Sequence, residues 1–201
     1  MSGDYNMILA TSRITHPYHL DYIAKVAKYA EVDTLLLCGD VSVSESFMKE
    51  FSHTNLLMVS GDEDDIHVIK LAKKHNVLLD GKVVEVAGVK VGGVGTINTF
   101  LDYTALMSNV GRIDVLLTHF PPYGCLDRVP PLYIPSGLKS LRILIETIKP
   151  SIVFVGHSPK PTVEYCRGIP VIGVAGYLAL ADSIKPHNIR FIPVSQSFSL
   201  G

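Results

Sequence analysis

Two carboxylates and two imidazoles follow short apolar runs at four places in the sequence. Asp40 ends the run LLLCGD, Asp62 ends LLMVSGD, His119 ends VLLTH and His157 ends IVFVGH. Each run is typical of a buried parallel strand, so each polar residue stands just beyond a strand end. In open α/β sheets the ligand site lies there. We therefore expect four strands of one sheet to bring these residues together around a divalent cation such as Mn, Zn or Fe.

Each of the four residues also has a structural interpretation. A Gly-Asp pair after a strand is usually a turn. A lone histidine in that place is more often hydrogen-bonded within the protein than bound to a metal. The shared position of all four favours the metal site, because two buried carboxylates without a cation would be costly.

The elements that must position these residues alternate along the first two thirds of the chain. Apolar runs predict strands, and amphipathic patterns predict helices at 17–31, 64–75 and 138–148, with a short helix or turn at 44–51. The strands are expected at 7–10, 34–38, 56–59, 114–118 and 152–155. Residues 83–94 predict a β-hairpin, and 162–193 carries three further strand-like pieces. This order indicates an α/β fold with a parallel sheet beside an antiparallel one.

Length and composition bound the class of protein. The chain has 201 residues, of which 47% are hydrophobic and 18% charged, and its net charge is -1. One domain over residues 1–201 is expected. Disorder is excluded, and there is no basic field for general nucleic-acid or membrane binding. The sequence has three cysteines and no C-x-x-C pair. It also shows no signal-peptide pattern and no apolar run long enough to cross a bilayer. We therefore expect a cytoplasmic protein.

The order of these motifs resembles that of the calcineurin-like metallophosphoesterase family. The motifs are GD at 39–40, GDED at 61–64, THFPP at 118–122 and GH at 156–157, within a resemblance that spans residues 7 to 176. It implies a sandwich of two β-sheets flanked by helices, with four α/β/β/α layers. It also implies two metals, bridged by one aspartate, that activate a water to attack a phosphate ester.

Three ligands that the family uses for one of its two metals are absent. The motif D-x-H is replaced by TSR at 11–13, and G-H-x-H reads GHSP at 156–159. The resemblance assigns the other metal to Asp40, Asp62, His119 and His157, which all keep metal-competent side chains. We therefore expect one divalent transition metal, or none, and a low turnover, because a single metal cannot hold both the attacking and the leaving oxygen.

Two further residues are candidates for catalysis. Arg13 stands where a ligand of the missing metal would be. Its guanidinium would pair with Asp40 or hold a phosphate, and the alternative is a solvated loop residue. Glu63 stands where the family has a histidine that helps to protonate the leaving group. As an acid it would need a raised pKa, and we favour the alternative, an acidic helix start.

Two glycine- or proline-rich segments lie near the predicted strand ends. The loop 120–135 has five prolines and offers Tyr123, Arg128 and Tyr133 for substrate contact, or else is a rigid surface wall. The glycines at 92, 93 and 95 are not followed directly by a helical pattern. They are therefore expected to permit tight packing at a strand end rather than to bind a nucleotide.

Three functions fit these residues. The first is a weak or one-metal phosphoric ester hydrolase that acts on a small phosphomonoester, phosphodiester or nucleotide. The second is a non-catalytic scaffold for a protein partner or a homo-oligomer. The third is a phosphate or nucleotide-binding module that does not hydrolyse. The first is preferred, because the four remaining ligand types form a chemically consistent set.

Overall fold

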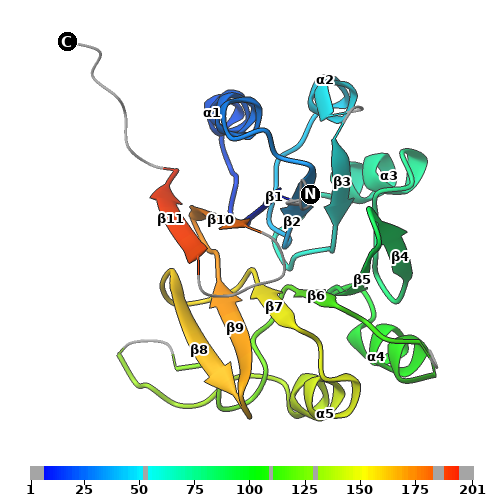
Figure 1. Ribbon diagram of the computed structural model, residues 1–201, viewed down its shortest axis with the longest axis vertical. Helices are drawn as coiled ribbons and strands as arrows, with labels where there is room; N and C mark the ends of the chain where they lie inside the picture. The colour runs from blue at the N-terminus through cyan, green and yellow to red at the C-terminus, as the bar shows by residue number, and fades with distance from the viewer. Residues whose placement is uncertain (1–6, 52–53, 109–110, 129–130, 183–187, 195–201) are drawn as a thin grey trace, which may run out of the picture.

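Two mixed β-sheets stack face to face in the computed structural model, which describes residues 7–51, 54–108, 111–128, 131–182 and 188–194 (Figure 1). The five-stranded sheet has the order β11-β10-β1-β2-β3. Its strands are β1 (Met7–Thr11), β2 (Thr34–Leu37), β3 (Asn55–Met58), β10 (Tyr177–Asp182) and β11 (Ile189–Pro193). The six-stranded sheet has the order β4-β5-β6-β7-β9-β8. Its strands are β4 (Val83–Val86), β5 (Val89–Val94), β6 (Val115–Thr118), β7 (Ile152–Val155), β8 (Thr162–Cys166) and β9 (Ile169–Gly173).

Helices cover the outer face of each sheet, which gives the expected α/β/β/α layers (Figure 1). The helices α1 (Pro17–Tyr29), α2 (Glu45–Glu50) and α3 (Ile66–Lys74) pack on the five-stranded sheet. The helices α4 (Thr99–Ser108) and α5 (Lys139–Ile148) pack on the six-stranded sheet. No helix in these described ranges is long and apolar enough to cross a membrane.

Alternation along the buried strands builds three apolar layers. In β2, Leu35 and Leu37 pack toward α1–α3, whereas Leu36 faces the second sheet. In β7, Phe154 lies between the sheets and Val153 packs toward α4 and α5. Because successive side chains point to opposite faces and both faces are covered, these strands are apolar at nearly every position.

Two features of the fold differ from the sequence expectations. The described part of 162–193 holds four strands rather than three, because the apolar run 169–181 turns at Gly176 (φ 69°) and contributes β9 to one sheet and β10 to the other. The helix α4 was not expected. Its apolar residues Phe100 and Leu101 are exposed and Asp102 is buried, so its sequence lacks an amphipathic pattern.

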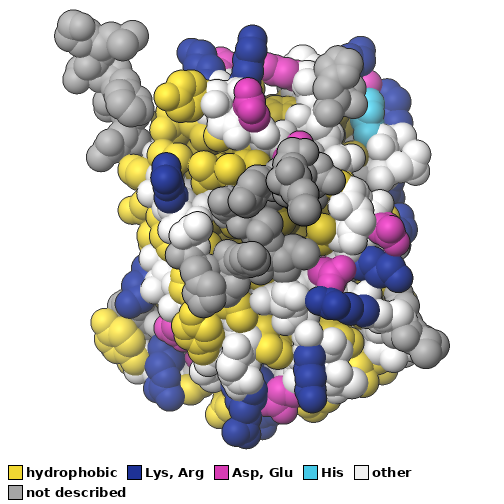
Figure 2. All heavy atoms as spheres, viewed as in Figure 1, with side chains coloured by type: hydrophobic (Ala, Val, Ile, Leu, Met, Phe, Trp, Pro, Cys, Tyr) yellow, Lys and Arg dark blue, Asp and Glu magenta, His cyan; other side chains and the backbone are white. Residues whose placement is uncertain are grey.

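The surface carries an apolar groove of about 500 Å³ between α1 and the β10–β11 edge. Figure 2 shows hydrophobic side chains gathered at the upper left, over this region. The groove is lined in part by Met7, Val26, Tyr29, Leu180 and Ile192. None of the four predicted metal ligands is among its lining residues.

Candidate metal centre

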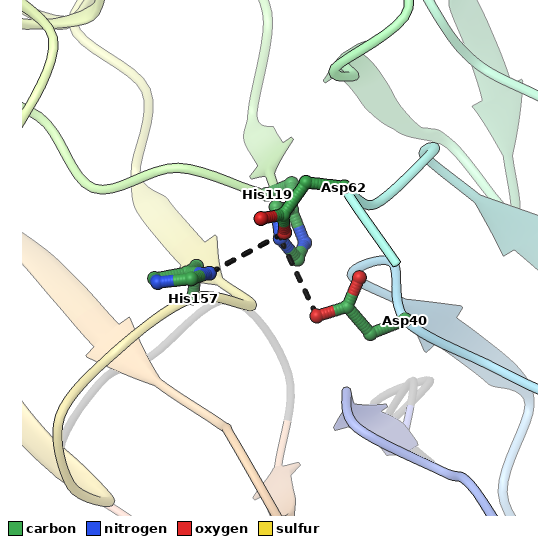
Figure 3. Close-up of side chains that lie close together, drawn as sticks. All are labelled: Asp40, Asp62, His119 and His157. Carbon is green, nitrogen blue, oxygen red and sulfur yellow. Dashed lines mark hydrogen bonds and ion pairs between the residues drawn. The ribbon is translucent and has the colours of Figure 1, made fainter. Parts of the chain in front are cut away.

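The four predicted ligands come together, but from two sheets rather than one (Figure 3). Asp40 and Asp62 follow the neighbouring parallel strands β2 and β3 of the five-stranded sheet. His119 and His157 follow β6 and β7, which are parallel neighbours in the six-stranded sheet. The expectation of a single sheet is therefore wrong. The two sheets stack with these strand ends side by side, so the ligands meet across the gap between the layers.

The glycines of the motifs allow the strand-end loops to touch backbone to backbone. A Cβ on Gly156 would collide with the carbonyl oxygen of Cys38, and one on Gly61 would collide with the backbone nitrogen of Asp40. Asp40 itself has a φ of 55°, in the left-handed region that Asp and Asn tolerate better than most residues. Close approach of the loops thus explains the Gly-Asp and Gly-His pairs.

The ligand atoms of the four residues all lie within 4.8 Å of one another. His119 Nε2 is 2.5 Å from Asp62 Oδ1 and 3.6 Å from Asp40 Oδ2, and His157 Nδ1 is 3.4 Å from Asp62 Oδ1. The side chains of Asp40 and His119 are 1% and 0% exposed, whereas those of Asp62 and His157 are 41% and 35% exposed. Only one of the two carboxylates is buried, contrary to the expectation, and the site opens to solvent at Asp62 and His157.

The hydrogen bonding of His119 leaves its other nitrogen, Nε2, facing a carboxylate oxygen across a contact that a proton or a metal ion would hold. Nδ1 lies 2.8 Å from the Cys38 carbonyl oxygen, which can only accept, so Nδ1 carries the hydrogen. In the neutral ring Nε2 is then an acceptor that faces the carboxylate oxygen of Asp62 at 2.5 Å. Two acceptors at this distance need a proton or a metal ion to hold them. A backbone carbonyl on the far nitrogen is also the usual support of a metal-binding histidine.

Two further buried atoms at the centre lack hydrogen-bond partners. These are Asp40 Oδ2 and His157 Nδ1. The other oxygen of Asp40 accepts a hydrogen bond of 3.0 Å from the backbone N–H of Glu63. A buried polar atom without a partner costs about 1–3 kcal/mol, and carboxylate oxygens and imidazole nitrogens suit Zn, Mn or Fe. The donor set therefore fits a divalent transition metal.

The electrostatics of Asp62 favour its ionised form. Desolvation is the largest single effect and raises its pKa. When protonated, His119 donates a hydrogen bond to Asp62, and both His119 and His157 carry a positive charge. These effects outweigh desolvation and hold the pKa of Asp62 below its ordinary value. A deprotonated carboxylate is the form that binds a metal.

The acidic run after Asp62 divides into residues with different tasks. Asp65 caps α3 by accepting from His67 N at 2.7 Å, and the helix begins at Ile66 rather than at residue 64. Asp64 accepts from the backbone N–H groups of Val41 at 2.7 Å and Gly61 at 2.6 Å, and so ties together the two loops that carry aspartate ligands. Its role was missed, because no local pattern distinguishes it from Asp65.

The two residues proposed for catalysis lie at the rim of the centre. The side chain of Glu63 is exposed, and only its backbone N–H contacts Asp40. Arg13 is exposed, and its backbone N–H donates to Gly39 O at 3.4 Å. Within the described ranges no ion pair joins Arg13 to Asp40, so the pairing considered from the sequence is not formed.

The candidates in the loop 120–135 fall into two groups. Arg128 donates from Nη1 to the backbone oxygen of Tyr133 at 3.0 Å, and both residues line one pocket. Tyr123 is 41% exposed, and Lys139 Nζ lies 5.6 Å from its ring centroid. Tyr123 is not among the residues that line this pocket.

Comparison with protein-family models finds no match, and neither does comparison with the sequences of curated proteins. Solved structures are similar in fold. The protein TT1561 of Thermus thermophilus matches with a TM-score of 0.73 at 18% identity, over 94% of this chain and 99% of that one. An archaeal phosphodiesterase matches with a TM-score of 0.56 at 17% identity, over 93% and 99%. GAP50, described as the anchor in the inner membrane complex of Plasmodium, matches with a TM-score of 0.59 at 9% identity, over 94% and 85%. The expected two-sheet fold is confirmed.

Proposed function

We propose that this chain, which has the fold of the calcineurin-like metallophosphoesterases, is a one-metal phosphoric ester hydrolase of low turnover. The observation that carries the proposal is the 2.5 Å contact between His119 Nε2 and Asp62 Oδ1, given that His119 Nδ1 already donates to a carbonyl. The similarity in fold to an archaeal phosphodiesterase supports the same class of reaction.

Asp40, Asp62, His119 and His157 would hold the cation. The cation would supply Lewis-acid polarisation of a phosphoryl oxygen and an acidified water. Asp40 and His119 are buried and fixed by the backbone of Glu63 and Cys38, so they form the rigid side of the centre. Asp62 and His157 border the solvent, where a phosphate ester would approach.

The positions of the missing D-x-H motif explain why one metal is proposed. Thr11 Oγ1 donates to the Tyr177 carbonyl at 2.9 Å, and Ser12 Oγ donates to the Gly39 carbonyl at 2.8 Å. Both hydroxyls are thus committed to backbone. Arg13, which brings a positive charge to this side, would hold a phosphate oxygen rather than a metal. Low turnover follows, because one metal cannot hold both the attacking and the leaving oxygen.

The test is a calorimetric titration of Mn²⁺ into chelator-stripped protein, with hydrolysis of p-nitrophenyl phosphate and its bis-ester measured in parallel. About one Mn²⁺ per chain and slow, Mn-dependent hydrolysis are expected, and both should be lost in Asp40→Asn. Asn is chosen because it tolerates the left-handed backbone of residue 40. Asp21→Asn, on the exposed face of α1, is the matched control.

Other outcomes separate the alternatives. Metal and phosphate binding without hydrolysis would favour the phosphate or nucleotide-binding module. A protein that takes up no Mn²⁺ or Zn²⁺ would overturn the proposal and favour the scaffold. Light scattering would then determine whether the chain forms a homo-oligomer, and a protein partner would be sought.

A further inference from the structure

A pocket of about 310 Å³ is formed by the loops that follow β6 and β7. These are the adjacent parallel strands that end at His119 and His157. The loop after β6 supplies one wall, and the segment after His157 together with β8 supplies the other. The lining includes Leu126, Asp127, Arg128, Tyr133, Lys160 and Glu164.

The pocket lies within the length of a small molecule from the metal centre. Lys160 follows His157 by three residues, so their Cα atoms are at most about 11 Å apart. Phe120 stands at the start of the loop after β6, before the residues that line the pocket. Its ring centroid lies 5.2 Å from that of His119 and 5.8 Å from that of His157. A ligand of about this length can therefore contact the metal centre and the pocket at the same time.

One oxygen of each carboxylate that lines the pocket accepts backbone N–H groups. Asp127 is 1% exposed, and its Oδ2 accepts from Gly124 at 2.8 Å and Gly137 at 3.2 Å. Glu164 Oε2 accepts from Leu126 N at 2.9 Å. These bonds hold Asp127 against the backbone of Gly124 and Gly137 and tie Leu126 to β8, so this part of the wall is formed before any ligand arrives.

The cationic side chains of the pocket keep free donors. Arg128 uses Nη1 for the Tyr133 carbonyl, and among the described residues no other partner takes its remaining N–H groups. Lys160 is exposed, and no ion pair engages it within the described part of the chain. Tyr133, whose side chain offers an aromatic ring, lines the same pocket.

We propose that this pocket binds a second anionic group of the substrate, so that the preferred substrates are phosphate esters with another phosphate or carboxylate across a short spacer. The inference rests on the proposed function, which places the reacting phosphate at the metal centre. Arg128 and Lys160 hold the second anion, and Tyr133 packs on the spacer.

The test compares hexyl phosphate with hexane-1,6-diyl bisphosphate by calorimetric titration into Mn²⁺-loaded protein. The bisphosphate is expected to bind about tenfold more tightly, beyond the roughly twofold statistical gain of two equivalent ends. In Lys160→Gln and Arg128→Gln this ratio should fall toward the statistical value, while the affinity for hexyl phosphate stays the same. Lys70→Gln, on the exposed face of α3, should keep the full ratio.

The inference is overturned if the wild-type ratio is only statistical, or if it survives in the Lys160→Gln and Arg128→Gln double variant. Unchanged Mn²⁺ affinity in these variants shows that the metal centre is intact. If the protein binds no Mn²⁺, the proposed function fails by itself. Lys160-dependent binding of the bisphosphate to the metal-free protein is still expected in that case, and its absence would count against the pocket.

Discussion

The candidate metal centre and the neighbouring carboxylates Asp64 and Asp80 all involve the loop 60–64, yet their polar atoms are hydrogen-bonded very differently. At the centre, Asp40 Oδ2 and His157 Nδ1 make ion-pair contacts of 3.6 and 3.4 Å but no hydrogen bond. In contrast, both oxygens of Asp64 accept backbone N–H groups. The two oxygens of Asp80 accept Ser60 N at 2.9 Å and Ser60 Oγ at 2.7 Å. A cation at the centre would satisfy Asp40 Oδ2 and His157 Nδ1, whereas the carboxylates that are already hydrogen-bonded hold the loops in place.

The hydrogen bonds of Asp64, Asp80 and Ser60 form what we call the satisfied network, which extends away from the centre to the start of α4. Ser60 Oγ accepts from Thr96 N at 2.9 Å, and Thr96 Oγ1 donates to the Gly61 carbonyl at 2.7 Å. Asp102 Oδ2 accepts from Gly95 N at 2.9 Å. A Cβ on Gly95 would collide with Asp80 and Ser60. This agrees with the expectation that the glycines at 92, 93 and 95 permit tight packing at a strand end.

The largest expected effect is at the centre. Asp40→Asn should weaken Mn²⁺ binding about 1000-fold, or roughly 4 kcal/mol, because a charged ligand is lost. In the presence of chelator the same variant should be as stable as the wild type or more stable, since the charge of a carboxylate that is 1% exposed is removed. Calorimetry and thermal unfolding measure the two quantities. A large loss of stability with chelator present would make Asp40 a structural residue.

Asp64→Ala should show the opposite pattern. Two backbone N–H groups lose a carboxylate, so the free energy of unfolding should fall by about 2–3 kcal/mol, with or without Mn²⁺. Urea unfolding in both conditions measures this change. If Asp64→Ala instead kept full stability and lost only metal binding, the distinction between the two regions would be broken.

Asp102 provides a pH test of the satisfied network. Desolvation, with a smaller effect from Asp80, raises the pKa of Asp102 to about 6 from an ordinary value of 3.8. The folded state thus holds this proton more tightly than the unfolded state. The stability that the proton adds is complete below pH 3.8 and is lost as the pH rises through 6. Asp102→Asn should remove this dependence and stabilise the protein at pH 7 by about 1–2 kcal/mol. Equal pH profiles for variant and wild type would contradict it.

The smallest effect is expected at Arg13. Its side chain is exposed and forms no ion pair with Asp40 in the part of the chain that the structure describes. Arg13→Gln should therefore leave stability within about 0.5 kcal/mol. It should lower kcat/KM for p-nitrophenyl phosphate by less than about threefold. The reason is that solvent weakens the contact of an exposed guanidinium with a phosphate. A loss of about 100-fold, or roughly 2.7 kcal/mol, would place Arg13 in the catalytic machinery.

Local sequence patterns predicted many of the strands and helices and the four candidate ligands. The buried strands, α1, α3, α5 and the β4–β5 hairpin could be predicted, because period and turn residues are local properties. The ligands at 40, 62, 119 and 157 could be placed at strand ends for the same reason. The helix α4 could not, since Asp102 is buried and Phe100 exposed, against the usual pattern.

What the sequence by itself determined was the set of chemical groups and their position along each strand. Only the tertiary structure decided that the groups come from two stacked sheets, that Asp62 and His157 face solvent while Asp40 and His119 do not, and that Lys160 joins Arg128 in one pocket. Asp64 and Asp80 likewise acquire their roles only through loops distant in sequence. The physical reason is that hydrogen bonding and burial depend on which segments pack together. The sequence of a single strand does not specify which sheet the strand joins.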